Sequence, residues 1–275
     1  MSAIPGPAWL FCPADRPERY GKAAAVADVV VLDLEGSVAP ADKDYARRSL
    51  LDRSLDPART VVRISAAGTD DYRRDLRALA DTPYSRVMLS GCESPEHVTA
   101  LAPREVIALI ESPRGALAVE DIALAMGTIG VMWGAEDLLV GLGGQSSRHD
   151  DGTYRDVARH VRSSTLLAAK AFGRWALDSA YLDINDHDGL RTETLDAVAV
   201  GFDAKVAIHP DQIEVIRRAY EPSESQVEWA RRVLAAVPES RGVFRFEGQM
   251  VDAPVLRHAE QVLRRSVAAR ANGGR

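Results

Sequence analysis

The sequence predicts an α/β fold of the (β/α)8 TIM-barrel type. Short apolar segments alternate with segments of helical spacing from residue 9 to about residue 220. The apolar segments are nearly continuous runs, which is typical of parallel strands that are covered on both faces. The chain has 275 residues, 46% of them hydrophobic, and this suits one large domain with a full core. A doubly wound sheet is the alternative, but it would carry a glycine-rich turn where this chain has Pro13-Ala-Asp-Arg.

Each predicted strand is a short run of apolar and β-branched residues between turn signals. The predicted strands are Trp9–Cys12, Val29–Leu34, Thr60–Ile64, Arg86–Leu89, Glu105–Ile110, Gly130–Gly134, Trp175–Tyr181 and Lys205–Ile208. Helical spacing lies between them, for example over Gly115–Met126 and Thr153–Phe172. Pro40, Pro95 and Pro113 stand where a helix begins, a position that proline tolerates.

The pattern changes after Tyr220, and the rest of the chain lies outside the eight β/α units. We therefore divide the chain into a catalytic barrel of residues 1–220 and a C-terminal segment of residues 221–275. This appendage is a lid, an oligomer contact or a cap on the barrel. Its predicted helix, hairpin strands and second helix are Ser223–Ala236, Val243–Phe246, Met250–Val251 and Ala253–Ala269.

Composition excludes several classes of protein. The net charge of -6 and the pI near 5.6 argue against nucleic acid as the main partner, because phosphate binding needs a basic face. No apolar run approaches the roughly 18 to 20 residues that span a bilayer, so we expect no membrane segment. The first residues do not read as a signal peptide, and Cys12 and Cys92 are too few for a disulfide framework. A cytoplasmic protein fits best.

Carboxylates follow two of the predicted strands directly. The run Val106–Ile110 stops at Glu111, and Val131–Ala135 stops at Glu136 and Asp137. An unpaired buried charge is expensive, so an acid at the end of a buried strand needs a reason. In a TIM barrel the carboxyl ends of the strands form the active site, and we expect these acids to meet there.

Glu111 and Asp137 form the best candidate metal pair. Two carboxylates that leave room for water and substrate oxygens suit Mg²⁺, which keeps several exchangeable ligands. The alternative is that each acid caps the next helix. That alternative concerns Asp137 more than Glu111, because Ser112 is the better capping residue type beside Glu111.

Other charged and polar residues share the predicted barrel mouth. Asp33 and Glu35 follow the second strand, and Arg63 ends the third. A guanidinium there can bind a carboxylate or thioester oxygen and offset developing negative charge. A structural ion pair of Arg63 with Asp33 or Glu35 is the alternative, and both roles can hold together. The other residues expected at strand ends are Pro13, Ser90, Asp183 and His209.

The positions of the lysines favour metal-dependent chemistry. The chain has only four, and three of them, Lys22, Lys43 and Lys170, fall in helical segments. Lys205 begins its strand, which predicts a place at the end of the barrel opposite to the acids. No lysine is therefore expected to form a Schiff base at the mouth, and this argues against a lysine-dependent aldolase.

Seven segments, in order over nearly the whole chain, carry a family resemblance: Leu10–Arg19, Val29–Glu35, Val61–Ile64, Ala108–Gly115, Trp133–Leu138, Lys205–Pro210 and Gly248–Pro254. With them the chain resembles the citrate lyase beta-subunit-like branch of the HpcH/HpaI aldolase family, which also includes malyl-CoA and citramalyl-CoA lyases. There is one departure. Relatives often read Asp-Leu-Glu-Asp-Ser-Val, whereas this chain has Gly36 in place of the second acid.

The resemblance implies a Mg²⁺-dependent barrel enzyme that acts on acyl-CoA thioesters. Glu111 and Asp137 would bind the metal, and Arg63 together with Glu111 would contact the substrate. Asp252 matches an acid that reaches into a neighbouring subunit's site in several relatives, which implies a homotrimer or a hexamer. Because Gly36 departs from the family pattern, the resemblance does not identify the acyl group.

The leading hypothesis is carbon–carbon cleavage of a 3-hydroxyacyl-CoA of the citryl, malyl, citramalyl or hydroxymethylglutaryl type. The products are acetyl-CoA and an oxo compound. Glu35 is the candidate base, Arg63 would stabilise the thioester enolate, and Asp252 would move a proton to its carbon. The alternatives are hydrolysis or condensation of a CoA thioester on the same scaffold, and a citrate lyase beta subunit that needs partner subunits.

Overall fold

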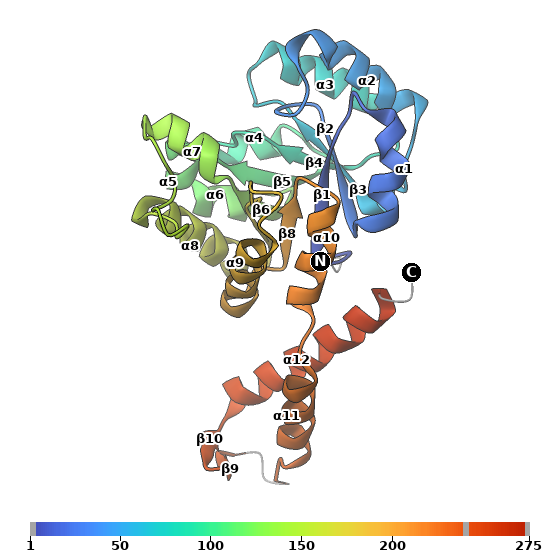
Figure 1. Cartoon of the computed structure of the whole chain (residues 1–275). Helices are drawn as coiled ribbons and strands as arrows, with labels where there is room; N and C mark the ends of the chain where they lie inside the picture. The colour runs from blue at the N-terminus through green and yellow to red at the C-terminus, as the bar shows by residue number, and fades with distance from the viewer. Residues whose placement is uncertain (1–3, 239–241, 273–275) are drawn as a thin grey trace. The chain divides into compact units, whose positions relative to one another are not determined.

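The computed structural model describes residues 4–238 and 242–272 and divides into two compact units between Ile216 and Arg217. The first unit is a closed barrel of eight parallel strands in the order β1 to β8 (Figure 1). This confirms the predicted TIM barrel. The strands are β1 Ala8–Pro13, β2 Val29–Asp33, β3 Thr60–Ile64, β4 Arg86–Leu89, β5 Glu105–Ile110, β6 Thr128–Trp133, β7 Trp175–Asp178 and β8 Ala204–Ala207.

Side chains fill the barrel interior in alternation along the strands. Buried residues such as Val29 and Val31 on β2 and Ile107 and Leu109 on β5 belong to one apolar cluster inside the barrel. On β2, β3 and β5, the next inward position beyond this cluster is Asp33, Arg63 and Glu111, at the carboxyl end. The alternation therefore directs the side chains at these ends, Glu111 among them, into the barrel mouth.

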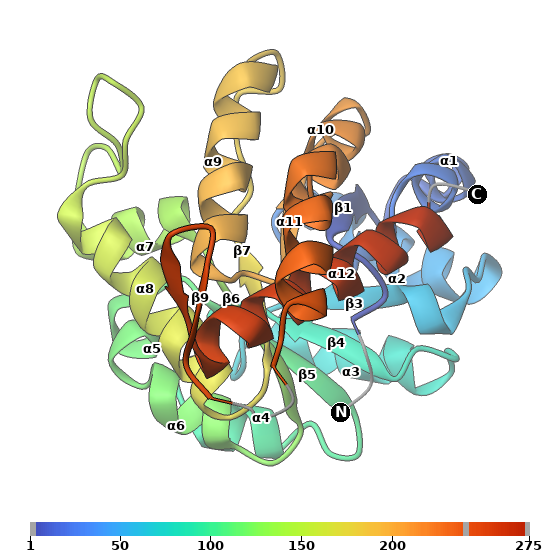
Figure 2. The same cartoon turned by 90° about the horizontal axis from the view of Figure 1, so that it is seen from below.

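Helices α1 to α10 surround the barrel (Figure 2). The segment predicted as one helix over Gly115–Met126 is two short helices instead. They separate at Ala118, whose φ of -100° and ψ of 6° leave the α-helical region. The helices are α1 Pro17–Val26, α2 Lys43–Asp52, α3 Asp70–Ala80, α4 Pro95–Thr99, α5 Pro113–Leu117, α6 Val119–Leu124, α7 Ala135–Leu142, α8 Asp156–Ala171, α9 His187–Val200 and α10 Asp211–Tyr220.

A buried charged network joins the barrel wall to helices α8 and α9. The ammonium of Lys205 contacts Asp178 Oδ2 at 3.0 Å, the carbonyl oxygen of Ser179 at 2.7 Å and Glu193 Oε1 at 2.8 Å. The sequence did not predict this network, although Lys205 does pair with Ala8 at the start of β1. The strands are staggered, and this places Lys205 in register with Asp178 at the carboxyl end of β7.

The second unit contains the predicted helix, hairpin and helix. A capping box between Ser223 and Gln226 begins its first helix. Glu247 and Gly248 have positive φ angles of 48° and 83°, as a tight hairpin turn requires. The elements are α11 Glu224–Ala235, β9 Phe244–Phe246, β10 Gln249–Val251 and α12 Ala253–Asn272. None of the helices in the described part of the chain has the length and apolar character that a membrane crossing needs.

Candidate active site

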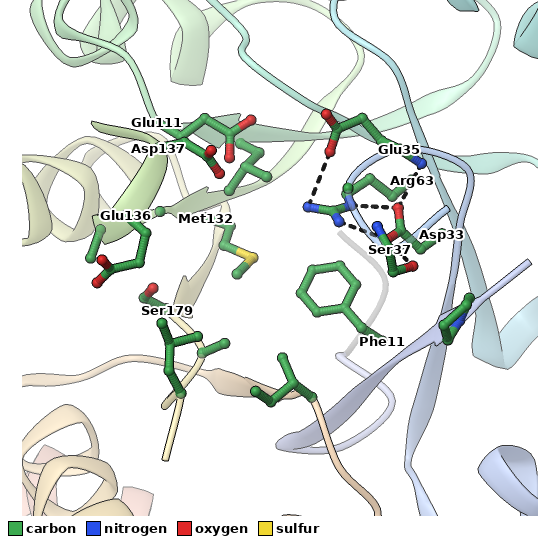
Figure 3. Close-up of a pocket in the computed structure, with 18 residues that line it drawn as sticks. Phe11, Asp33, Glu35, Ser37, Arg63, Glu111, Met132, Glu136, Asp137 and Ser179 are labelled. Carbon is green, nitrogen blue, oxygen red and sulfur yellow. Dashed lines mark hydrogen bonds and ion pairs between the residues drawn. The ribbon is translucent and has the colours of Figure 1, made fainter. Parts of the chain in front are cut away.

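A cavity of about 410 Å³ opens at the carboxyl ends of the barrel strands (Figure 3). Its lining includes six of the residues that the sequence placed at the mouth: Pro13, Asp33, Glu35, Arg63, Glu111 and Asp137. The figure shows Glu111 and Asp137 next to each other, with Arg63 and Glu35 across the cavity from them. The barrel thus brings together acids and a guanidinium from strands that are far apart in the sequence.

Some predicted residues have other surroundings. Ser90 is buried but is not among the lining residues. Asp183 forms a local turn, in which its Oδ1 accepts a hydrogen bond from the backbone of Asn185. Nδ1 of His209 lies 3.5 Å from Oδ2 of Asp211. Asp252 lies in the second unit between β10 and α12, where its Oδ1 accepts a hydrogen bond from the backbone of Val255. The role predicted for Asp252 therefore stays a prediction.

The lining residues that sequence reasoning did not identify include Phe11, Ser37 and Ser179. Phe11 could have been found from the alternation along its strand, because Trp9, two residues earlier, is in the interior cluster. Ser179 follows Leu177 in the same way. Ser37 lies beyond its strand, where no alternation applies.

Asp33 and Arg63 form a buried ion pair at the mouth. Arg63 Nε donates to Asp33 Oδ1 at 2.7 Å and Nη2 donates to Oδ2 at 2.7 Å. Burial alone would raise the pKa of Asp33, but hydrogen bonds and charge from Arg63, with hydrogen bonds from Ser37 and the Glu35 backbone, hold this pKa below its usual value. The structural ion pair considered for Arg63 is therefore present, and the guanidinium also lines the cavity. Its role toward a ligand stays a prediction.

The guanidinium of Arg63 is held on a second side by Phe11, whose ring centre lies 4.5 Å from Cζ. Glu35 is more loosely attached, with Oε2 at 3.6 Å from Arg63 Nη1. Burial and, to a lesser extent, the charge of Asp33 raise the pKa of Glu35, although Arg63 opposes this shift. A carboxyl group whose pKa moves toward neutrality is suited to accept a proton.

Glu111 has one carboxylate oxygen fixed by the backbone. Oε1 accepts a hydrogen bond of 2.7 Å from the amide of Gly91. A side chain at Gly134 would come within 3.2 Å of Oε2, so the glycine leaves room around that oxygen. Burial, and then the charge of Asp137, raises the pKa of Glu111 to about 8. Two acids that repel each other beside a cavity favour a bound cation.

Asp137 lies in the first turn of α7 and does not cap it. The capping position is Gly134, and no side-chain hydrogen bond caps this helix. Ser112 does cap α5, accepting a hydrogen bond from Gly115, as its residue type predicted. The capping alternative thus has no support for Asp137, and both acids are available to a ligand.

The pair fits a magnesium ion better than a metal with an all-protein shell. Within residues 4–238 and 242–272, no three His, Cys, Asp or Glu side chains gather to hold a metal by themselves. Mg²⁺ is commonly bound by one or two carboxylates and completes its octahedron with water and substrate oxygens. Glu111 and Asp137 offer oxygen donors of this kind beside an open cavity.

Comparisons with known proteins place the chain in a family. A family model described as HpcH/HpaI aldolase/citrate lyase matches residues 8–210, and one for C–C bond lyases of the TIM-barrel fold matches residues 154–269. A citrate lyase subunit beta-like protein of Mycobacterium tuberculosis is 64% identical over 261 residues, covering 95% of this chain and 96% of that protein. The human mitochondrial citramalyl-CoA lyase is 31% identical over 294 residues, covering 94% of this chain and 85% of that protein.

A solved structure resembles nearly the whole chain. The crystal structure of CitE from Mycobacterium tuberculosis in complex with magnesium, acetoacetate and coenzyme A superimposes with a TM-score of 0.93 at 63% identity. The match covers 96% of this chain and 98% of that chain. The barrel and the matches over most of the sequence agree, and the chain belongs to the HpcH/HpaI aldolase/citrate lyase family.

Proposed function

We propose that this protein is a Mg²⁺-dependent carbon–carbon lyase that cleaves a 3-hydroxyacyl-CoA into acetyl-CoA and an oxo compound. The observation that carries the proposal is the arrangement of one cavity, with Glu111 and Asp137 on one side and Arg63 and Glu35 on the other. Family membership supports the reaction class. The magnesium and coenzyme A in the related CitE structure support the metal and the thioester.

Each residue has a distinct task in this proposal. Mg²⁺ held by Glu111 and Asp137 would act as a Lewis acid toward the oxygen on the carbon that is cleaved. Glu35 would take the hydroxyl proton, since its raised pKa favours proton uptake. Arg63 would stabilise the negative charge that develops on the thioester oxygen when the bond breaks.

The related structure also suggests which acyl group to test first. Acetoacetate and coenzyme A are bound together in that relative. Acetoacetate and acetyl-CoA are the two fragments of 3-hydroxy-3-methylglutaryl-CoA. We therefore propose this thioester as the first candidate, with the citramalyl, malyl and citryl thioesters as the comparison set.

The C-terminal segment, residues 221–275, would form a lid or an oligomer contact on the catalytic barrel of residues 1–220. We propose a homotrimer or a hexamer, in which Asp252 of one chain moves a proton to the enolate carbon in the site of another chain. A cytoplasmic location is proposed as well, because both cysteines are free thiols buried in the fold.

A partner-dependent citrate lyase subunit is the second candidate. It is favoured by matches to citrate lyase beta subunits, such as that of Escherichia coli at 34% identity over 264 residues. The two candidates differ in one measurable respect. A stand-alone lyase acts on free CoA thioesters as a purified single protein, whereas a dependent subunit shows no such activity.

The substrate panel tests the proposal directly. Purified protein is assayed with Mg²⁺ and each of the four thioesters, in both stereoisomers where these exist, and the products are identified by mass spectrometry.

Glu111→Gln and Asp137→Asn should each lower kcat at least about 100-fold, because each removes a charge that holds the metal. Full activity in either variant, with unchanged dependence on Mg²⁺, would remove the metal assignment.

A further inference from the structure

Gly36 lies in the loop after β2 and lines the same cavity as Glu35 and Ser37. Its φ is outside the left-handed region that favours glycine. The backbone conformation at this position therefore does not require glycine. The absence of a side chain there must have another cause. The surroundings of the missing Cβ supply that reason.

A Cβ atom on Gly36 would collide with the guanidinium of Arg63. It would lie 2.9 Å from Nη2, 3.7 Å from Cζ and 3.9 Å from Nη1. Arg63 cannot easily move away, because its Nε and Nη2 are bound to the buried carboxylate of Asp33 at 2.7 Å each. The ring of Phe11 also contacts the guanidinium. The glycine thus preserves a space beside a fixed cation.

The edge of Arg63 that faces this space can still bind a ligand. A guanidinium has five N–H donors. The edge formed by Nε and Nη2 is occupied by Asp33, as the dashed lines in Figure 3 show. The edge formed by Nη1 and Nη2 faces the space at Gly36, with Glu35 Oε2 at 3.6 Å from Nη1. Two adjacent η nitrogens match the two oxygens of a carboxylate.

We propose that Gly36 is a specificity-determining residue that keeps this outer edge of Arg63 open for the carboxylate of the acyl group. The inference rests on the proposed function, since it concerns the acyl group that the lyase cleaves. The reacting hydroxyl belongs beside Glu111 and Asp137, on the side of the cavity opposite to Arg63. A longer acyl arm needs more room beside Arg63, and the missing Cβ of Gly36 leaves that room next to Nη2. Gly36 therefore favours a carboxymethyl arm over a carboxyl group bound directly to the reacting carbon.

Two thioesters test the length of the arm. 3-Hydroxy-3-methylglutaryl-CoA and citramalyl-CoA differ by a single methylene between the reacting carbon and the carboxylate. The selectivity is the kcat/KM for 3-hydroxy-3-methylglutaryl-CoA divided by that for citramalyl-CoA. We expect Gly36→Ala to lower this ratio by about tenfold or more, the usual effect of one methylene in a pocket. Gly21→Ala is the matched control, because Gly21 lies in α1 and its Cβ would meet no atom within 4 Å. The control should leave the ratio unchanged.

The contact between Arg63 and the carboxylate of the acyl group is tested with Gly36→Asn and Gly36→Asp. The two new side chains have nearly the same size but differ in charge. The aspartate would occupy the outer edge of Arg63 with its own carboxylate and repel the ligand. We expect it to weaken the binding of acetoacetate, measured by calorimetry, at least about tenfold more than the asparagine does. Thermal melting of each variant verifies that it is folded.

Binding also separates this inference from the proposed function. Acetoacetate and pyruvate differ by the same methylene. Their dissociation constants can be measured even if the protein catalyses no reaction. If the wild-type protein cleaves no thioester while Gly36→Ala still shifts the ratio of these constants, the lyase proposal fails and the role of Gly36 stands. An unchanged ratio in folded Gly36→Ala, for thioesters and oxo acids alike, overturns the role of Gly36. Equal losses for asparagine and aspartate overturn the carboxylate contact.

Discussion

At the scale of single residues, the pair of Asp33 and Arg63 serves both the fold and the cavity. Asp33 is fully buried and accepts hydrogen bonds from two nitrogens of Arg63. This fixes the guanidinium against the wall of the barrel and leaves its outer edge toward the cavity. A lysine could not do both, because an ammonium lacks two separate planar edges.

We expect Asp33→Asn to lower the free energy of unfolding at pH 7 by about 3 kcal/mol, because it leaves Arg63 buried without its charged partner. The loss should depend on pH. The pKa of Asp33 is lower in the folded state than in the unfolded state, so the stability it contributes is present above pH of about 4 and fades as the pH falls through the folded value. Urea unfolding at pH 7, 5 and 3 measures this.

Asp70→Asn is the control for this experiment, because Asp70 forms an exposed pair with Arg73 on α3. Its effect on stability should be small at every pH. A stability difference between wild type and Asp33→Asn that stays constant from pH 7 to pH 3 would contradict the described ion pair.

At the scale of elements, continuous apolar runs made the strands predictable. The ranges predicted for β3, β4 and β5 agree with the structure, and the acids that follow such runs were placed correctly at the mouth. The hydrogen bond from Gly91 to Glu111 was not predictable, because nothing in the two segments indicates their register. The surroundings of Lys205 were missed for the same reason, since they depend on the stagger between β7 and β8.

The network around Lys205 gives a prediction about β7 and β8. Lys205→Met should lower the free energy of unfolding by about 3 kcal/mol or more, because Asp178 and Glu193 lose a buried positive partner. Lys170→Met is the comparison, since Lys170 pairs with Asp203 near the surface and should cost below about 1 kcal/mol. Urea unfolding of both variants measures the difference. Equal effects would show that the Lys205 network does not stabilise the barrel wall.

At the scale of the whole molecule, the proposal divides one active site between two chains. Glu111 belongs to the barrel unit and Asp252 to the C-terminal unit. Family resemblance, rather than any pattern in the residues, drew attention to Asp252. No apolar periodicity could have done so, because this acid lies beyond the barrel strands.

Mixed oligomers test this division. Glu111→Gln and Asp252→Asn should each be nearly inactive, whereas co-expressed mixtures should regain activity. With random mixing, about a quarter of the sites combine an intact Glu111 with an intact Asp252 from a neighbour. Light scattering should show a trimer or a hexamer. A monomer, or mixtures as inactive as the parent variants, would contradict the shared site.

The most direct test of the central claim is the product balance of one reaction. Purified protein is incubated with Mg²⁺ and 3-hydroxy-3-methylglutaryl-CoA, and acetyl-CoA, free CoA and acetoacetate are quantified by mass spectrometry. The proposal predicts acetyl-CoA and acetoacetate in equal amounts, no product after EDTA treatment, and recovery when Mg²⁺ is added back. Release of free CoA without an oxo acid, or cleavage that persists at full rate in EDTA, would contradict a metal-dependent carbon–carbon lyase.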